Sequence, residues 1–197
     1  YVLAEAECQA LLKDYTQAGE TLEIRYLLSN VYSAQKNLNN AEEQLQLILK
    51  ADPGNITVNN DLGYLWADQN KNLDKAEAMI RRAIELDRQQ RKLTRGLTAD
   101  EDRDNAAYID SLGWVLYKQK KYKEALEPLK QAAADNEDGD HIEIWDLLAD
   151  CYLALGQKKE AVATWEKALK LEDVSKRDGE RRRKITQKLN KARAEKE

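Results

Sequence analysis

The chain has 197 residues, of which 35% are charged and 42% hydrophobic, and its formal net charge is −4. Strong helix formers are abundant, whereas the chain has only two prolines and no phenylalanine, so a helical protein is expected. No apolar stretch is long enough to cross a bilayer, and no signal-peptide pattern opens the chain. Because Tyr1 falls inside a helix-like pattern, we expect a soluble fragment of a longer protein. Its compartment, cytoplasmic or periplasmic, stays open.

Charge is distributed unevenly along the sequence. From Lys176 to the end, ten Lys and Arg residues stand against four Asp and Glu residues, while residues 1–175 carry 22 against 32. A nucleic-acid-binding domain usually spreads its basic charge over a folded face, and no aromatic residue follows Ser175 to stack on bases. The run ERRRK at 180–184 is therefore interpreted as the basic face of a helix. Nucleic acid and an acidic membrane surface are minor alternatives.

Helix-like patterns follow one another from residue 2 onwards, and four of them share a set of columns. A leucine followed by a small residue marks each first helix; the small residues are Ser29, Gly63, Gly113 and Ala149. An alanine follows about twelve residues later, in a second helix-like stretch; these alanines are Ala41, Ala76, Ala125 and Ala161. The alanine spacings are 35, 49 and 36 residues, which indicates repeats of two helices each.

The columns have a simple physical meaning. The leucine, the small residue and a bulky residue three positions later lie on one face of the first helix. The small residue and the alanine let the two helices of a unit approach closely, and large side chains fill the space between units. One helix pair cannot bury that stripe alone, so the units must stack. The sequence therefore predicts an all-α array of stacked helix pairs.

The segments LGYLWADQNKNLDKAEAMIRRAIEL (62–86) and LGWVLYKQKKYKEALEPLKQA (112–132) resemble tetratricopeptide (TPR) repeats. Their sequences also resemble the repeats of long bacterial TPR arrays. The resemblance implies a right-handed superhelix of antiparallel helix pairs, an α–α solenoid. We expect the second helix of a truncated repeat at 1–21. Four repeats follow at 22–55, 56–105, 106–141 and 142–173, and the second of them contains an insertion at 87–105. A C-terminal capping helix is expected at 174–197.

The inserted segment, residues 87–105, has its own expectations. Its first half extends the preceding helix, and its acidic second half leads to a capped helix start near Asp104. The run DEDRD at 100–104 has alternate carboxylates, as a calcium loop does. Asn105 and Ser111 replace the glycine and the closing glutamate that such a loop needs, so we predict a solvated loop and no metal.

Signals of catalysis are nearly absent. His141 is the only histidine and is expected to flank the start of a helix. Cys8 and Cys151 lie far apart in amphipathic stretches and are interpreted as buried free thiols. No phosphate-binding loop, dinucleotide fingerprint, zinc-protease or nucleophile-elbow motif is present. We therefore predict a protein that is not an enzyme and that has no cofactor.

The first helices of TPR repeats line the concave groove. The side of each first helix that lies opposite the packing stripe is therefore a candidate binding surface. The residues that point there by helical position are Tyr26, Asn30, Asn60, Asp61, Tyr64, Asp110, Ser111, Trp114, Tyr117, Asp146 and Asp150. Amides and carboxylates can bond a peptide backbone while rings supply apolar contact. Some of these rings could instead pack against neighbouring repeats or the insertion.

The charge of these residues indicates the kind of ligand. TPR domains that bind chaperone C-termini share a basic clamp for carboxylates; Asn30 fits that clamp, but Tyr26 stands where it has a lysine. The acidic residues on the same side favour a basic or neutral peptide. We predict a non-catalytic protein–protein interaction scaffold that binds a peptide or partner protein in the groove. The alternatives are a regulatory arm of a larger enzyme and a self-association module.

Overall fold

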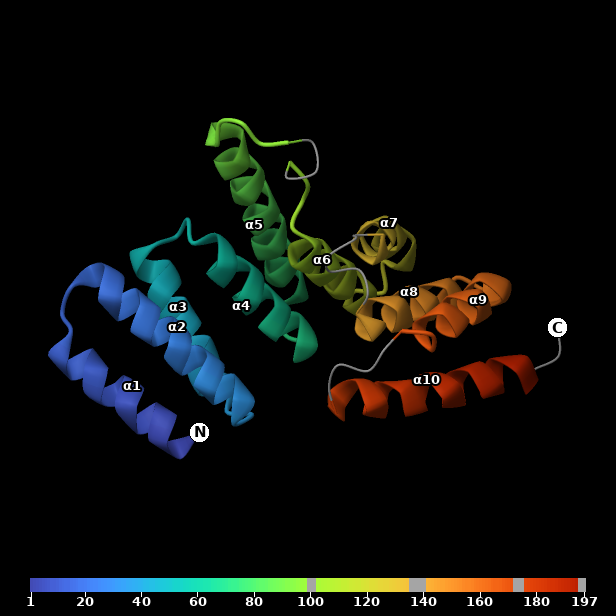
Figure 1. The fold of residues 1–197 in the computed structure, drawn as a ribbon, viewed down its shortest axis with the longest axis horizontal. Coiled ribbons are helices and arrows are strands. Elements are labelled where there is room, and N and C mark those ends of the chain that lie inside the picture. The colour runs from blue at the N-terminus through green and yellow to red at the C-terminus, as the bar shows by residue number, and fades with distance from the viewer. Residues whose placement is uncertain (99–101, 135–140, 172–175, 195–197) are drawn as a thin grey trace. The chain divides into compact units, whose positions relative to one another are not determined.

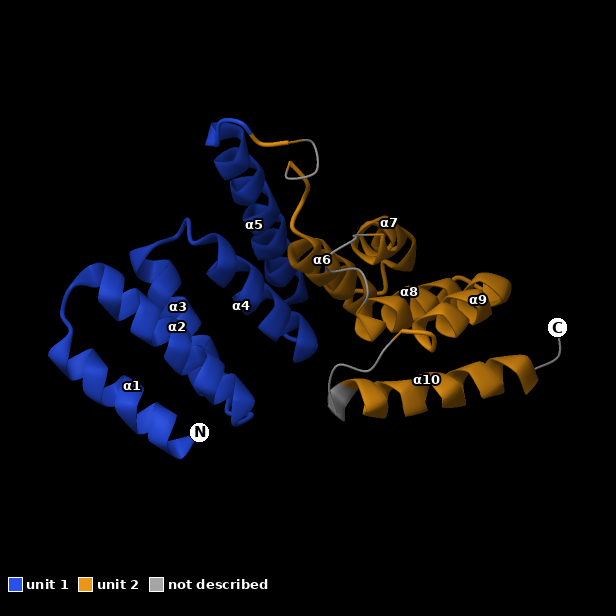
Figure 2. Ribbon diagram, viewed as in Figure 1, with its two compact units in different colours: residues 1–96 blue, residues 97–197 orange. Residues whose placement is uncertain are grey.

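The computed structural model describes residues 1–98, 102–134, 141–171 and 176–194, and these residues form ten helices and no strand (Figure 1). The all-α prediction is confirmed. The chain divides into two compact units, residues 1–96 and residues 97–197 (Figure 2). Within the described residues, no helix combines the length and the apolar character that crossing a membrane requires.

Unit 1 contains five helices, each packed against the next one in the chain. Their bounds are α1 (Val2–Asp14), α2 (Ala18–Ala34), α3 (Leu38–Ala51), α4 (Ile56–Asp68) and α5 (Leu73–Leu93). The pairs α2–α3 and α4–α5 are the expected first two helix pairs, and α1 packs on α2 as the helix of a preceding pair would. Because α5 continues to Leu93, the first part of the inserted segment extends a helix, as expected.

Unit 2 contains the other five helices of the described residues. Their bounds are α6 (Ala106–Lys118), α7 (Tyr122–Ala133), α8 (Ile142–Ala154), α9 (Lys158–Ala168) and α10 (Lys176–Ala194). The pairs are α6–α7 and α8–α9, with α7 packed on α8, and α10 contacts both helices of the last pair. Of the expected capping segment, residues 174–175 and 195–197 lie outside the described residues, as do residues 99–101 of the acidic run.

The turn inside each helix pair has the same backbone form. Seven residues after each small residue of the first helices, a residue adopts positive φ; these residues are Lys36 (62°), Asn70 (59°), Lys120 (63°) and Gly156 (75°). The next backbone N–H then donates to the carbonyl of the bulky column residue, as Lys71 does to Trp66 at 2.8 Å. This is the left-handed helix cap that closes the last turn. Its recurrence supports the alignment of the columns.

The helices of a pair approach closely where the sequence predicts it. A Cβ added at Gly63 would lie 2.9 Å from the carbonyl oxygen of Ala76 and 2.7 Å from Cγ1 of Ile80. One added at Gly113 would lie 2.5 Å from Cδ2 of Leu129. The four column alanines of the second helices are completely buried. A larger side chain in the glycine positions would therefore force the two helices apart.

The ends of the helices follow from local chemistry. Asn105 rather than Asp104 precedes α6, and its side-chain oxygen accepts from the N–H groups of Ala107 and Tyr108 at 3.0 and 3.3 Å. Asn55 caps α4 in the same way, accepting from the N–H of Val58. His141 occupies the position before α8, as expected, without a side-chain capping bond.

These distances generate a test of the helix approach. Replacing Gly63 by Ala adds a methyl group against the Ala76 carbonyl, so we expect the free energy of unfolding to fall by about 1–3 kcal/mol. Gly19, in the first turn of α2, is the matched control because nothing lies within 4 Å of its added Cβ. Gly19→Ala should raise the free energy of unfolding by up to about 1 kcal/mol, because alanine has a higher helix propensity than glycine. Urea unfolding followed by circular dichroism compares the stabilities of the two variants. An equal increase in the free energy of unfolding for both would contradict the close approach of α4 and α5 at Gly63.

Candidate functional site

In unit 1 the predicted groove residues lie on α2 and α4, where Asp61 joins the two helices. Its Oδ2 accepts from the Tyr26 hydroxyl at 2.8 Å, and its Oδ1 accepts from Nδ2 of Asn60 at 3.2 Å. Burial raises the pKa of Asp61, and the two donors oppose that rise without cancelling it. Among the described residues Asp61 forms no ion pair. It is a half-buried carboxylate with hydrogen bonds but no counter-charge.

A cleft of about 420 Å³ opens beside this pair, between the first halves of α2 and α4. Its apolar walls include Leu22, Leu27 and Val58, and Tyr26 and Glu23 also line it. Leu27 is 55% exposed, so an apolar side chain faces the solvent here. The volume is sufficient for one large side chain of a ligand. Asp61 is one hydrogen bond away from the cleft through Tyr26.

The other predicted residues of unit 1 differ in their exposure. Asn30 is exposed and Tyr64 is 37% exposed, as a binding surface requires. Asn60 is buried, and its Oδ1 has no hydrogen-bond partner among the described residues. Asn60 therefore holds Asp61 through a hydrogen bond and does not present its own side chain to the solvent.

In unit 2 the predicted residues of α6 form an aromatic cluster. The rings of Trp114 and Tyr117 stack, with centroids 5.9 Å apart and an interplanar angle of 9°. Nζ of Lys118 lies 4.8 Å from the centroid of the Trp114 ring, a cation–π contact. Burial, and then the nearby Asp150 carboxylate, raises the pKa of Tyr117 to about 12. Ser111 is buried and donates to the carbonyl of Ala107 at 2.9 Å, so it belongs to the helix interior.

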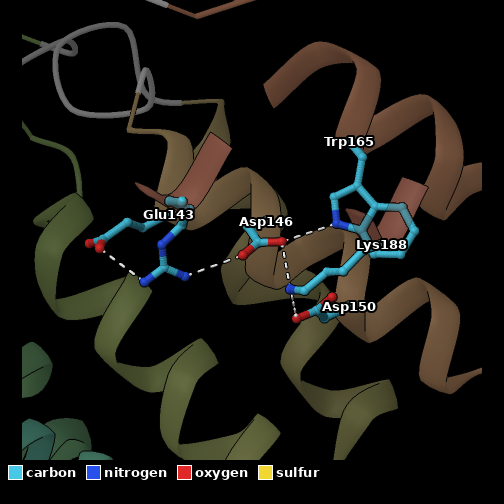
Figure 3. A network of polar contacts seen from close by, with 6 residues as sticks. Glu143, Asp146, Asp150, Trp165 and Lys188 are labelled. Carbon is cyan, nitrogen blue, oxygen red and sulfur yellow. Dashed lines mark hydrogen bonds and ion pairs between the residues drawn. The ribbon is translucent and has the colours of Figure 1, made fainter. Parts of the chain in front are cut away.

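The predicted residues of α8 are already in contact with part of this chain (Figure 3). Lys188 of α10 donates to Asp146 at 2.8 Å and to Asp150 at 2.6 Å. Arg181 of α10 donates to Asp146 at 3.3 Å and to Glu143 at 3.0 Å. The carboxylates Glu143, Asp146 and Asp150 are called the α8 acidic face below.

Asp146 is the centre of this network. Its side chain is only 3% exposed, and its Oδ1 also accepts from the indole N–H of Trp165 at 3.1 Å. A buried carboxylate is stable only when charges and donors surround it, and here a ring of α9 and two cations of α10 do so. The sequence placed Asp146 on the groove side, but the structure buries it beneath α10.

Three residues of this network are not among the groove residues that the sequence predicts: Glu143, Arg181 and Lys188. The sequence predicts a capping helix in the basic tail but does not indicate which residues its cations contact. A signal was present, because Arg181 and Lys188 lie seven residues apart and so share a helix face. Ile185, Leu189 and Ala192 lie on the same face and are buried.

Asp110 of α6 faces the same region of α8. Burial, and then repulsion by Glu143, raises the pKa of Asp110 to about 6, while His141 and Arg181 oppose the rise. Burial, and then repulsion by Asp146, also raises the pKa of Asp150, against the effect of Lys188. Carboxylates of α6 and α8 thus form a negative region that attracts cations.

Metal-binding groups and cysteine thiols are the features of the described residues that bear on catalysis. They contain no group of three or more His, Cys, Asp or Glu side chains that could hold a metal ion. Cys8 and Cys151 are buried free thiols. Burial, and then the Asp150 charge, raises the pKa of Cys151 to about 12, which disfavours the thiolate that a nucleophile needs.

Comparison with known families fixes the class of the protein. Residues 22–55 match the family model described as tetratricopeptide repeat. The chain is a TPR protein. Over residues 69–168, about half of its length, it belongs to the family described as "Anaphase-promoting complex, cyclosome, subunit 3". The complex in that description is the family's namesake and is not assigned to this chain.

A curated relative supports the assignment. The chain is 28% identical over 128 residues to the TPR repeat-containing protein PA4667 of Pseudomonas aeruginosa. The match covers 65% of this chain but only 19% of the relative, so the two are similar over a fifth of the longer protein. The resemblance to bacterial repeat arrays fits this source.

Solved structures show the same fold. TTC0263, a thermophilic TPR protein of Thermus thermophilus, has a TM-score of 0.65 and 21% identity, with 93% of this chain and 89% of that chain covered. A crystal structure of MamA has a TM-score of 0.59 and 18% identity, with 88% and 91% covered. This fold is typical of protein–protein interaction scaffolds.

The raised pKa of Asp110 predicts how stability depends on pH. Its native pKa of about 6 exceeds the ordinary value of about 3.9, so the stability that this group supplies is complete below that ordinary value. It is lost as the pH rises through about 6. Asp110→Asn removes the charge that is costly at neutral pH, so the variant should be more stable than the wild type there by about 1–3 kcal/mol.

Urea unfolding of both proteins at about pH 7.5 and at about pH 4 measures this difference. The gain should be present at the higher pH and nearly vanish at the lower one. Asp14→Asn, at the exposed end of α1, is the matched control. A gain of equal size at both pH values, or a loss at neutral pH, would contradict the burial of the Asp110 charge.

Proposed function

We propose that the protein is a non-catalytic scaffold that binds a segment of a partner protein in the groove. The segment lies along the predicted groove residues of the first helices. The observation that carries this proposal is the cleft between α2 and α4, whose lining combines apolar side chains with the Glu23 carboxylate. Asp61 lies next to the cleft, where it accepts a hydrogen bond from the lining residue Tyr26 and forms no ion pair among the described residues. Leu27 is 55% exposed, so the apolar wall of the cleft is open to a ligand from the solvent.

The chemistry of the cleft indicates the ligand. A large apolar side chain of the partner fills the cleft, and a neighbouring lysine or arginine reaches Asp61 or Glu23. Tyr26 supports both contacts, since its ring lines the cleft and its hydroxyl holds Asp61. The partner segment is therefore basic or neutral, because an acidic segment would meet repulsion from both carboxylates.

The aromatic cluster of α6 offers a second contact region in unit 2. The rings of Trp114 and Tyr117 stack and are partly exposed, and such rings often carry much of an interface's energy. This region takes part in the same kind of interaction. The alternatives remain a regulatory arm of a larger enzyme and a self-association module; the length of the Pseudomonas relative favours a role within a larger protein.

An array of synthetic peptides that share one apolar anchor residue and differ only in net charge tests the proposal on the full chain. Cationic and neutral peptides should bind, and anionic ones should not. Calorimetry on a binding peptide should then show that Asp61→Lys weakens the affinity by about tenfold or more. Asp14→Lys, an equal charge change at the exposed end of α1, should leave the affinity unchanged. Equal binding of anionic peptides, or equal effects of both variants, would refute the proposal.

A further inference from the structure

Helix α10 is held on the last helix pair by its cations and by three buried apolar side chains. Besides Arg181 and Lys188 on the α8 acidic face, Arg182 donates to the carbonyls of Leu169 and Leu171, and Arg193 pairs with Glu166 at 2.5 Å. Four basic side chains of one helix therefore reach the preceding helices or the chain that directly follows α9. Three apolar side chains, Ile185, Leu189 and Ala192, complete the contact.

The two contacting faces have matching periods. On α8 the carboxylates stand at positions 143, 146 and 150, which places them along one side of the helix. On α10 the cations at 181 and 188 flank the apolar position 185, with 189 and 192 following. The apolar side chains lie in a cluster with Trp165, Ile142 and Ala149. The α8–α9 pair thus contacts a basic amphipathic helix.

The fit of α10 is incomplete. A cleft of about 440 Å³ lies beside the contact, lined by Tyr117 and Asp150 on one side and by Lys188 and Lys191 on the other. Leu153 also lines it and is 41% exposed. The side chains of Arg181 and Lys188 are about one-third exposed, at 32% and 34%. The helix that covers this face therefore leaves part of it uncovered.

We propose that the α8 acidic face is a docking site for a basic amphipathic helix of a partner protein, and that α10 is its resident occupant. The partner helix carries cations at positions i and i+7 and apolar residues at i+4, i+8 and i+11, as α10 does. It displaces α10 and fills the cleft that α10 leaves open. The surface lies in unit 2, so this inference does not depend on the α2–α4 cleft of the proposed function.

The burial of Asp146 determines which helices can replace α10. Asp146 is buried while a helix covers it, so a replacing helix without cations would leave it with only the Trp165 indole among the partners named here. A buried carboxylate without a cation is strongly unfavourable. An apolar or acidic helix therefore cannot take the place of α10. Only a helix that brings cations to Asp146 and Asp150 restores the network, which makes the site selective for charge as well as shape.

The probe for a test on the full chain is a fluorescent synthetic peptide with the sequence of residues 176–194. In the wild type the tethered α10 competes with the peptide, which lowers its apparent affinity. Lys188→Glu replaces the cation that contacts both Asp146 and Asp150, so the tethered helix should vacate the site more often. We expect the peptide to bind this variant at least about tenfold more tightly than the wild type.

Matched controls separate docking from general charge effects. Lys184→Glu changes the same charge one turn earlier on α10, at an exposed position, and should behave like the wild type. A peptide that itself carries Lys188→Glu should bind no protein. Circular dichroism verifies that each variant is folded, and Lys188→Gln serves as a milder replacement if Lys188→Glu is not.

Two results would overturn the proposal. If the peptide fails to bind the folded Lys188 variants, α10 is a permanent cap that no other helix replaces. If it binds wild type, Lys184→Glu and Lys188→Glu equally, its binding surface is not the one that α10 covers.

Discussion

The whole structure depends on how closely two helices of one repeat can approach. At Gly63 the carbonyl of Ala76 leaves no room for a side chain, and at Gly113 the Leu129 side chain occupies that space. This contact fixes each helix pair, and the left-handed residue in the turn between the helices fixes where the second helix begins. A pair built in this way buries only one face, so every outer face needs a neighbour.

The last pair obtains that neighbour from α10, and the way it does so links stability to function. An apolar cap would cover Trp165 and Ile142 equally well. Instead, the chain places Asp146 within the contact and surrounds it with Arg181, Lys188 and the Trp165 indole. Apolar packing in place of a buried ion network is often neutral or stabilising, so the network does not follow from stability alone. The proposed docking of a basic helix gives a reason for its presence.

The sequence predicted the repeats because their columns encode the close helix approach directly, as the glycines at 63 and 113 and the alanines at 76 and 125 show. Helical position also placed Tyr26 and Asp61 on neighbouring helices of unit 1. Helical position alone could not predict how deeply each residue is buried. Asn60, Ser111 and Asp146 are buried, because what covers a residue depends on other helices. The spacing of Arg181 and Lys188 defines a face of α10, yet nothing in the spacing indicates that α8 lies opposite.

Native-state hydrogen exchange of the full chain tests most directly whether α10 is an occupant that can leave. The account predicts that the amides of α10 exchange through an opening of lower free energy than the amides of α8 and α9. That free energy should fall further as salt is added, because screening weakens contacts between partly exposed charges. A single opening free energy shared by α8, α9 and α10, unchanged by salt, would contradict the account.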